Sequence, residues 1–122
     1  MAVTNLSIEV VSGGKLFNDT DNENTAVAVK ASSGTVYMIE VDNTANAAIT
    51  YVKLWDTAQG SVTVGTTAPV MIIPVAASAK ITLAVPTGIA FATAITVASV
   101  TTAGTAGTTS PTSAAIVRIV YA

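Results

Sequence analysis

Hydrophobic and polar residues alternate along most of this chain with a period of two, which is typical of β-strands that bury one face. The clearest alternation lies in residues 35–56, where two runs rich in β-branched and aromatic residues flank the Asn/Asp-rich residues 42–46. Alternating runs on either side of such a turn-forming cluster predict a β-hairpin. We expect this hairpin to be the centre of the fold, because it holds the single tryptophan and two of the three tyrosines.

The alternation also predicts which side chains share a face of this hairpin. In the first run, we expect Tyr37, Ile39 and Val41 on one face and Val36, Met38 and Glu40 on the other. In the second run, Val52 and Leu54 share a face with Thr50 and Asp56. The opposite face holds Ile49, Tyr51, Lys53 and Trp55. Tyr37 and Tyr51 are then candidates for cross-strand neighbours.

Further strands are predicted before and after the hairpin. They cover residues 2–11, 26–31, 70–75, 80–85, 89–100 with a break near 93–94, and 116–121, and residues 15–17 form either a short strand or a loop anchor. Residues 70–75 are continuously apolar, as expected of a strand buried on both faces, and Pro74 belongs at a sheet edge or strand end because it lacks an N–H group. Residues 86–88, Pro-Thr-Gly, are expected to close the preceding strand.

The remaining segments are predicted loops. Residues 18–24, NDTDNEN, are too polar for an interior, and the low-complexity residues 101–114 are expected to form a flexible, exposed loop. Nothing of helical period appears. About eight short strands in 122 residues predict a single-domain, all-β antiparallel sandwich, of which the jelly roll is one arrangement, preceded by a flexible N-terminal arm at residues 1–6.

The composition narrows the classes of function. The chain has no cysteine and no histidine, which removes disulfides, thiolate chemistry and the commonest general base and metal ligand. A net charge of −2 with scattered lysines gives no basic face for nucleic acid. Only 10 % of residues are charged, against about 25 % in a typical soluble domain. Such a surface favours a subunit covered partly by copies of itself or by another protein.

The high mean hydropathy of +0.64 raises the question of a membrane. Proline, glycine and threonine interrupt every window of about twenty residues, so no transmembrane helix is expected. The N-terminus lacks the basic and apolar regions of a signal peptide. We therefore expect a soluble protein made in a cytoplasm.

Residues 18–24 also suggest a calcium site, because Asp19, Asp21 and Glu23 alternate among asparagines that could add oxygen ligands. Against calcium, the glycine and the acidic twelfth ligand of an EF-hand loop are missing, and a merely solvated loop is the simpler interpretation.

Glu40, Asp42 and Asp56 are candidates for a pair of catalytic carboxylates, as in glycoside hydrolysis. Ion pairing with Lys53 or plain surface exposure explains them more simply. Since no nucleophile, phosphate or zinc motif occurs, the sequence predicts a protein that is not an enzyme and needs no cofactor.

Tyr37, Tyr51 and Trp55 allow two interpretations. Their rings could stack on a sugar, as aromatic faces do in carbohydrate-binding sandwiches. Large aromatic residues more often lie in a core or a subunit interface, and we favour that alternative.

The stretches that carry a family resemblance are VYMIEVDNTANAAITYVKLWDTA, VTVGTTAPVMIIPV, ITLAVPTGIAF and IVRIVY. They resemble a group of small virion proteins encoded among the structural genes of tailed bacteriophages. The likeness covers roughly residues 35–121, and Thr93-Ala94 departs from it, since that group often has glycine there.

The resemblance implies a virion structural protein, first a capsid decoration (cement) protein that forms homo-oligomers and binds the major capsid protein. An N-terminal arm adding a strand to a neighbour would extend such contacts. The alternatives are a subunit of the neck, tail or fibre, or a glycan-binding receptor module. A pilus-like or surface-layer subunit is disfavoured by the missing signal peptide.

Overall fold

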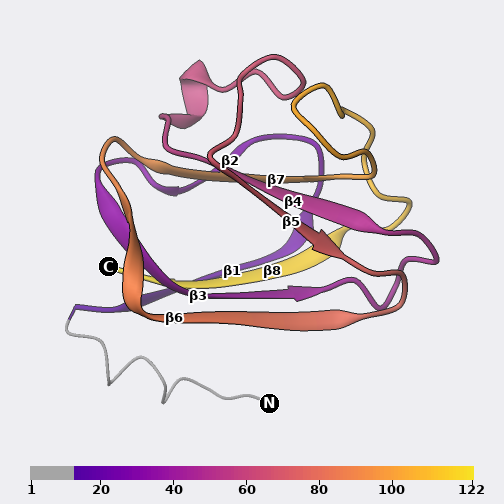
Figure 1. Cartoon of the computed structure of the whole chain (residues 1–122), viewed down its shortest axis with the longest axis horizontal. Coiled ribbons are helices and arrows are strands. Elements are labelled where there is room, and N and C mark those ends of the chain that lie inside the picture. Colours follow the sequence, from indigo (N-terminus) through magenta and orange to yellow (C-terminus); the bar gives the residue numbers. More distant parts are fainter. Residues whose placement is uncertain (1–12) are drawn as a thin grey trace.

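The structure, a computed structural model, describes residues 13–122 (Figure 1). The strand predicted at residues 2–11 and the arm predicted at residues 1–6 lie outside the described residues. Eight strands occur in the described part of the chain: β1 (Lys15–Asn22), β2 (Val27–Lys30), β3 (Gly34–Asp42), β4 (Thr50–Trp55), β5 (Met71–Val75), β6 (Lys80–Phe91), β7 (Ile95–Val100) and β8 (Ala115–Tyr121).

The strands form two four-stranded antiparallel sheets that face each other (Figure 1). The first sheet has the order β1-β8-β3-β6 and the second the order β2-β7-β4-β5. Strand β1 pairs with β8, β2 with β7, β3 with β6 and β4 with β5, so the chain folds back on itself from both ends. This is the winding of a jelly roll. The predicted all-β sandwich of about eight strands is therefore confirmed.

One hydrophobic core fills the space between the sheets. Alternate residues of each strand point inward, as the period of two requires. The core side chains come from both sheets: Val29, Val36, Ile39, Val41, Val52, Leu54, Ile73, Val75, Phe91, Ile95, Val97, Ala115, Val117 and Ile119. Because most of them are β-branched, they suit both strand backbone and close packing between pleated surfaces.

The predicted hairpin at residues 35–56 is wrong, although both of its strands exist. Strand β3 pairs with β6 and β8, whereas β4 pairs with β5 and β7 in the other sheet. The connection between them therefore crosses from one sheet to the other. An Asn/Asp-rich turn is compatible with either a hairpin or a crossing between sheets, and local sequence does not separate the two.

A β-bulge changes the predicted faces of β3. Against β8, Val36 and Met38 stand opposite the consecutive residues Tyr121 and Val120, so Tyr37 is an extra residue, whereas at the same point of the pairing with β6 the extra residues belong to β6. Val36 consequently joins Ile39 and Val41 on the core face, and all three side chains are at most 1 % exposed. The prediction that Tyr37 shares that face is wrong, because strict alternation cannot anticipate a bulge.

Strand β5 differs from the strand predicted at residues 70–75 in how it is buried. It is the edge strand of its sheet, its burial alternates, and Pro74 is exposed, so the strand is not buried on both faces. The placement of Pro74 at a sheet edge is confirmed. The strands buried on both faces are instead β7, where all six residues are buried, and β4, where five of six are.

Residues 86–88 do not end the strand that contains them. Strand β6 continues from Lys80 to Phe91, and the extra residues form an irregularity opposite the bulge of β3. Gly88 makes this possible with a φ of +81°, in the left-handed region that glycine tolerates. The predicted break near residues 93–94 does occur, between β6 and β7.

The polar residues 18–24 are not simply a surface loop. Residues 18–22 lie in β1, and Asn22 is fully buried. A register shift between Asp19 and Asn22 turns the Asn22 side chain inward, where its Oδ1 accepts a hydrogen bond from Ser99 Oγ. Buried amides are tolerated when they are hydrogen-bonded in this way.

Within residues 13–122, no helix is both long and apolar enough to cross a membrane.

Candidate functional site

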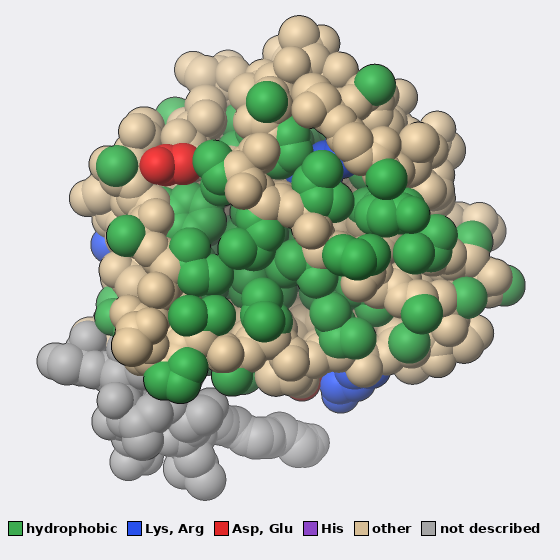
Figure 2. All heavy atoms as spheres, in the orientation of Figure 1, with side chains coloured by type: hydrophobic (Ala, Val, Ile, Leu, Met, Phe, Trp, Pro, Cys, Tyr) green, Lys and Arg blue, Asp and Glu red, His purple; other side chains and the backbone are tan. Residues whose placement is uncertain are grey.

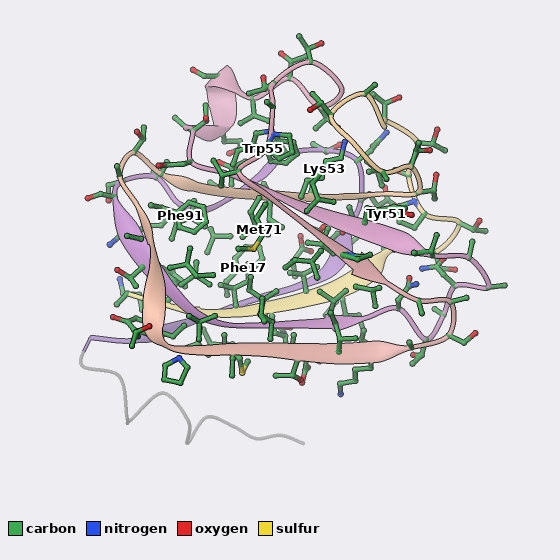
Figure 3. All side chains as sticks on the ribbon, in the orientation of Figure 1. Phe17, Tyr51, Lys53, Trp55, Met71 and Phe91 are labelled. Carbon is green, nitrogen blue, oxygen red and sulfur yellow. The ribbon has the colours of Figure 1, made fainter. Side chains whose placement is uncertain are left out.

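Trp55 lies inside the molecule, beneath a loop (Figure 3). Its side chain points away from the core on the outer side of β4, yet it is 0 % exposed. Residues 57–70 cover it, and its Nε1–H donates to the Thr67 carbonyl over 2.9 Å. A ring enclosed in this way cannot stack on a sugar, so its position supports a buried structural role beneath the loop.

The two tyrosines lie on different sheets. Tyr37 belongs to β3 and Tyr51 to β4, and both are half-buried. They are not cross-strand neighbours, which contradicts that prediction and follows from the separation of β3 and β4 into two sheets. Tyr51 lies beside Pro74 and Val100, and Tyr37 lies against Gly88. A joint aromatic platform of the three predicted side chains is therefore not formed.

Of the acidic residues proposed for calcium, Asp19 binds neighbouring groups of its own strand. Asp19 Oδ1 accepts from the Asp21 N–H over 2.9 Å, and Asp19 Oδ2 accepts from Asn22 Nδ2 over 3.0 Å. Glu23 follows the end of the strand. In the described range, no three acidic side chains come close enough together to hold a metal ion. The geometry of Asp19, Asp21 and Glu23 thus matches an ordered strand end.

Glu40 takes part in an ion cluster on the outer face of the first sheet. Arg118 Nη1 donates to Glu40 Oε1 over 2.7 Å, and Lys80 Nζ lies 3.8 Å from the same oxygen. The predicted partner, Lys53, is in the other sheet. The cross-strand register places Glu40 directly opposite Arg118, which fits ordinary stabilisation of a sheet.

The other two carboxylates cap turns. Asp56 accepts hydrogen bonds from the N–H groups of Thr93, Ala92 and Ala94, and the first of these bonds does most to lower the pKa of its carboxyl. Asp42 accepts from the hydroxyl and the N–H of Thr44, which likewise lowers its pKa. A general acid at neutral pH needs a raised pKa, so neither carboxylate suits that role.

Lys53 is a buried charge that the sequence pattern did not reveal. It lies on the outer side of β4 next to Trp55, and its side chain is 0 % exposed (Figure 3). Its Nζ donates to the carbonyls of Thr105, over 3.1 Å, and Gly107, over 2.9 Å. Burial lowers the pKa of this amine, and no carboxylate of the described residues pairs with it. Lys53 therefore holds the loop that covers it.

That loop, residues 101–114, is a covering layer and not only an exposed connection. Gly107 and Pro111 are buried, and the Thr101 N–H donates to the Thr109 carbonyl over 2.9 Å. Gly65, in the loop over Trp55, lies against Thr108, so the two loops touch. Together they close the outer face of the second sheet (Figure 1). Low complexity correctly predicted a loop, but its contacts come from the tertiary fold.

A buried amide network joins three connections at one end of the sandwich. Asn43 Nδ2 donates to the carbonyls of Ala48, Val75 and Ala76 at 3.0–3.2 Å. Asn43 Oδ1 accepts from Asn46 and Thr50, and Asn46 in turn bonds both backbone groups of Ser113. All these groups are satisfied within the chain, so the network is structural. The sequence indicated the turn but not this role.

The surface most suited to a partner is the opening between edge strands β5 and β6. It is lined by Met71, Ile73, Ile81, Leu83 and Ile89, and we call it the β5–β6 opening. Leu83 is 36 % exposed although it stands opposite core residue Ile39, and Val70, just before β5, is 62 % exposed. Figure 2 shows hydrophobic side chains gathered on this face between the two sheets. Exposed apolar surface of this kind marks sites of association.

Comparisons of the chain with protein-family models, with curated proteins and with solved structures find no match.

Proposed function

We propose that this chain is a non-enzymatic structural component of a tailed-bacteriophage virion, and that it is a capsid decoration (cement) protein. The observation that carries the proposal is where the family resemblance falls in the fold. The stretches that resemble small virion proteins build β3, β4, β5, β6 and β8, five of the eight strands described, with the loop that covers Trp55. The likeness thus follows the framework of the jelly roll.

The chemistry of the described residues supports a structural role. Glu40, Asp42 and Asp56 are engaged in ion pairs or turn caps, and Lys53 holds a loop. A jelly roll is also a common fold of viral capsid proteins and of lectins, although fold alone is only an analogy for function.

A decoration protein stabilises a shell by mass action. If it binds the assembled shell and not the free subunits, each occupied site favours assembly by about 2.7 kcal/mol when the free protein is at 100 times its Kd. Such a protein needs an apolar contact surface and no catalytic group. The β5–β6 opening and the low charge of the chain, 10 % of residues, agree with that requirement.

The alternative is a neck, tail or fibre subunit, or a glycan-binding receptor module. The burial of Trp55 speaks against glycan stacking, because the strongest aromatic candidate is enclosed. A tail or neck subunit would differ from a decoration protein in the protein that it binds. The fold does not distinguish the two.

The test is sedimentation of the purified protein with purified shells that lack it, and with unassembled capsid subunits. We expect saturable binding to shells, weak binding to subunits, and a higher rupture temperature of the decorated shells. No binding to shells at micromolar protein, together with binding to isolated tails, would transfer the protein to the alternative class.

A further inference from the structure

The β5–β6 opening is apolar because residues 13–122 cover the inward-facing side chains of β6 only in part. Leu83 and Ile81 stand opposite the core residues Ile39 and Val41, so both point toward the space between the sheets. Leu83 nevertheless remains 36 % exposed and Ile81 is only half-buried. Among residues 13–122, no strand pairs with β6 on this side, and Figure 2 shows hydrophobic side chains on this face.

Strand β6 also has an open hydrogen-bonding edge. It is twelve residues long and terminates its sheet, and among residues 13–122 no strand pairs with it on the side away from β3. Unpaired N–H and C=O groups along such an edge accept an added strand. Strand β5, on the other side of the opening, is less suited because it has five residues, one of them Pro74.

The chain itself contains a segment with the matching pattern. In residues 2–11, Leu6, Ile8 and Val10 alternate with Asn5, Ser7 and Glu9. As an added strand, this segment would direct three apolar side chains into the β5–β6 opening and three polar ones to solvent. From the apolar edge and the matching alternation, we propose that residues 2–11 of one copy add to β6 of a second copy, with Leu6, Ile8 and Val10 filling the opening.

The reach of the chain favours a second copy over the same one. Lys15 begins β1, at the opposite edge of the sheet from β6. A strand placed outside β6 lies four strand spacings from β1, roughly 19 Å away. The five residues from Lys15 back to Val10 span at most roughly 17 Å when fully extended. Val10 therefore falls short of β6 in its own chain.

A hairpin onto β1 of the same chain is the main competitor, since Gly13-Gly14 could form its turn. A two-residue turn would place Val10 opposite Phe17, which is favourable, but Ile8 opposite Asp19 and Leu6 opposite Asp21. Two of the three apolar side chains would then face carboxylates. Strand β6 offers Ile81 and Leu83 instead, so burial of apolar area favours β6.

This inference goes beyond the proposed function, because association between copies needs no shell. The test uses the absence of cysteine from the chain, which allows single thiols to report contact. Full-length Ile8→Cys is mixed with full-length Leu83→Cys under mild oxidation, the two copies carrying different tags. We expect a mixed disulfide dimer at least tenfold above the yields of two controls, Ser7→Cys with Leu83→Cys and Ile8→Cys with Ala84→Cys. Ser7 belongs to the polar row, and Ala84 is exposed on the outer face of β6.

Three results would overturn the proposal. Equal yields with Ser7→Cys and Ile8→Cys would show contact without docking of the apolar row. A disulfide that closes within single chains of the double variant Ile8→Cys/Leu83→Cys would show pairing in the same chain. A disulfide within single chains of Ile8→Cys/Asp19→Cys, in place of the dimer, would show the hairpin on β1.

A second measurement needs no thiol. We expect sedimentation velocity of the unmodified protein to show concentration-dependent association that Leu83→Lys weakens at least tenfold and Ala84→Lys leaves unchanged, with circular dichroism confirming that both variants are folded. A protein that stays monomeric at millimolar concentration would contradict the proposal whatever its affinity for shells.

Discussion

At the scale of single residues, this protein places polar groups in its interior, and several of them hold backbone segments in place. Lys53 is the clearest case, because its ammonium group is 0 % exposed and, among residues 13–122, bonds to two carbonyl oxygens and to no carboxylate. An amine without a carboxylate bears the full desolvation cost of its charge. Its retention makes sense if the carbonyls of Thr105 and Gly107 would otherwise be buried without a donor.

Replacing Lys53 by methionine is expected to destabilise the fold by about 1–3 kcal/mol at pH 7, since two carbonyls lose their donor. Urea denaturation measures this free energy of unfolding, and Lys15→Met, at an exposed position, is the control that should stay within about 0.5 kcal/mol. A variant more stable than the natural protein would show that the cost of burying the charge exceeds the gain from its hydrogen bonds.

The comparison of the natural protein with Lys53→Met also gives a prediction about the pH dependence of stability. Burial lowers the pKa of Lys53 in the folded state below its ordinary value of 10.5. Between the lowered pKa and that value, the unfolded chain binds more protons, so the free energy of unfolding rises with pH. The stability of the natural protein minus that of Lys53→Met should therefore increase as the pH approaches 10.5. A difference that is flat from pH 7 to 10.5 would refute the assignment.

At the scale of elements, the fold depends on irregularities that alternation alone does not encode. The bulge at Tyr37 and the left-handed Gly88 opposite it let β3 and β6 pair along their length. A Cβ at residue 88 would overlap Thr35 Cγ2 and crowd the Tyr37 ring. Residues 86–88, Pro-Thr-Gly, are therefore an irregularity within β6. The sequence pattern predicts instead that the strand ends there.

Gly88→Ala is expected to destabilise the protein by about 1–3 kcal/mol, because it combines a strained φ with a steric overlap. Gly60→Ala is the matched control, since residue 60 has no atom within 4 Å of an added Cβ and no positive φ. Thermal denaturation of both variants tests the difference. Equal melting temperatures would mean that the irregularity relaxes freely.

The connections between strands depend on Asn43, which links the β3–β4 and β5–β6 connections and, through Asn46, the segment before β8. Asn43→Leu keeps the volume but removes the side-chain donor to the Ala48, Val75 and Ala76 carbonyls, of which Ala76 keeps its bond from the Ala79 N–H. It also removes the acceptor of Asn46 and Thr50. We expect a loss of roughly 3–5 kcal/mol in the free energy of unfolding, among the largest for a single substitution. Asn18→Leu, at an exposed position of β1, should change it little, and similar losses for both would contradict the role of the network.

These elements show what the sequence could and could not predict. The sandwich, most of its strands, the break near residue 93 and the edge position of Pro74 follow from alternation and backbone chemistry, whereas the second half of β1 and the continuation of β6 through residues 86–88 do not. The placement of β3 and β4 in different sheets does not follow from the sequence, because a turn rich in asparagine suits both a hairpin and a crossing between sheets. The burial of Lys53 and Trp55 depends on loops that fold over the second sheet, and that of Asn22 on a register shift in β1, and neither has a local signature in the sequence.

At the scale of the whole molecule, the two sheets differ in how they are covered. Residues 57–70 and 101–114 close the outer face of the second sheet, so β4 and β7 are buried on both sides. The sandwich is left open between β5 and β6, where Leu83 and Val70 are exposed. A molecule with so few charges and one apolar edge is suited to association, with copies of itself or with a larger assembly.

The central claim, a place on the capsid surface, is tested most directly by cryo-electron microscopy of virions produced with and without this gene. We predict that the deletion removes density for a small β-domain repeated over the outer capsid surface, and that the resulting shells rupture at lower temperature. An unchanged capsid surface with density lost from the neck or tail, or with no density lost anywhere on the particle, would contradict a decoration role.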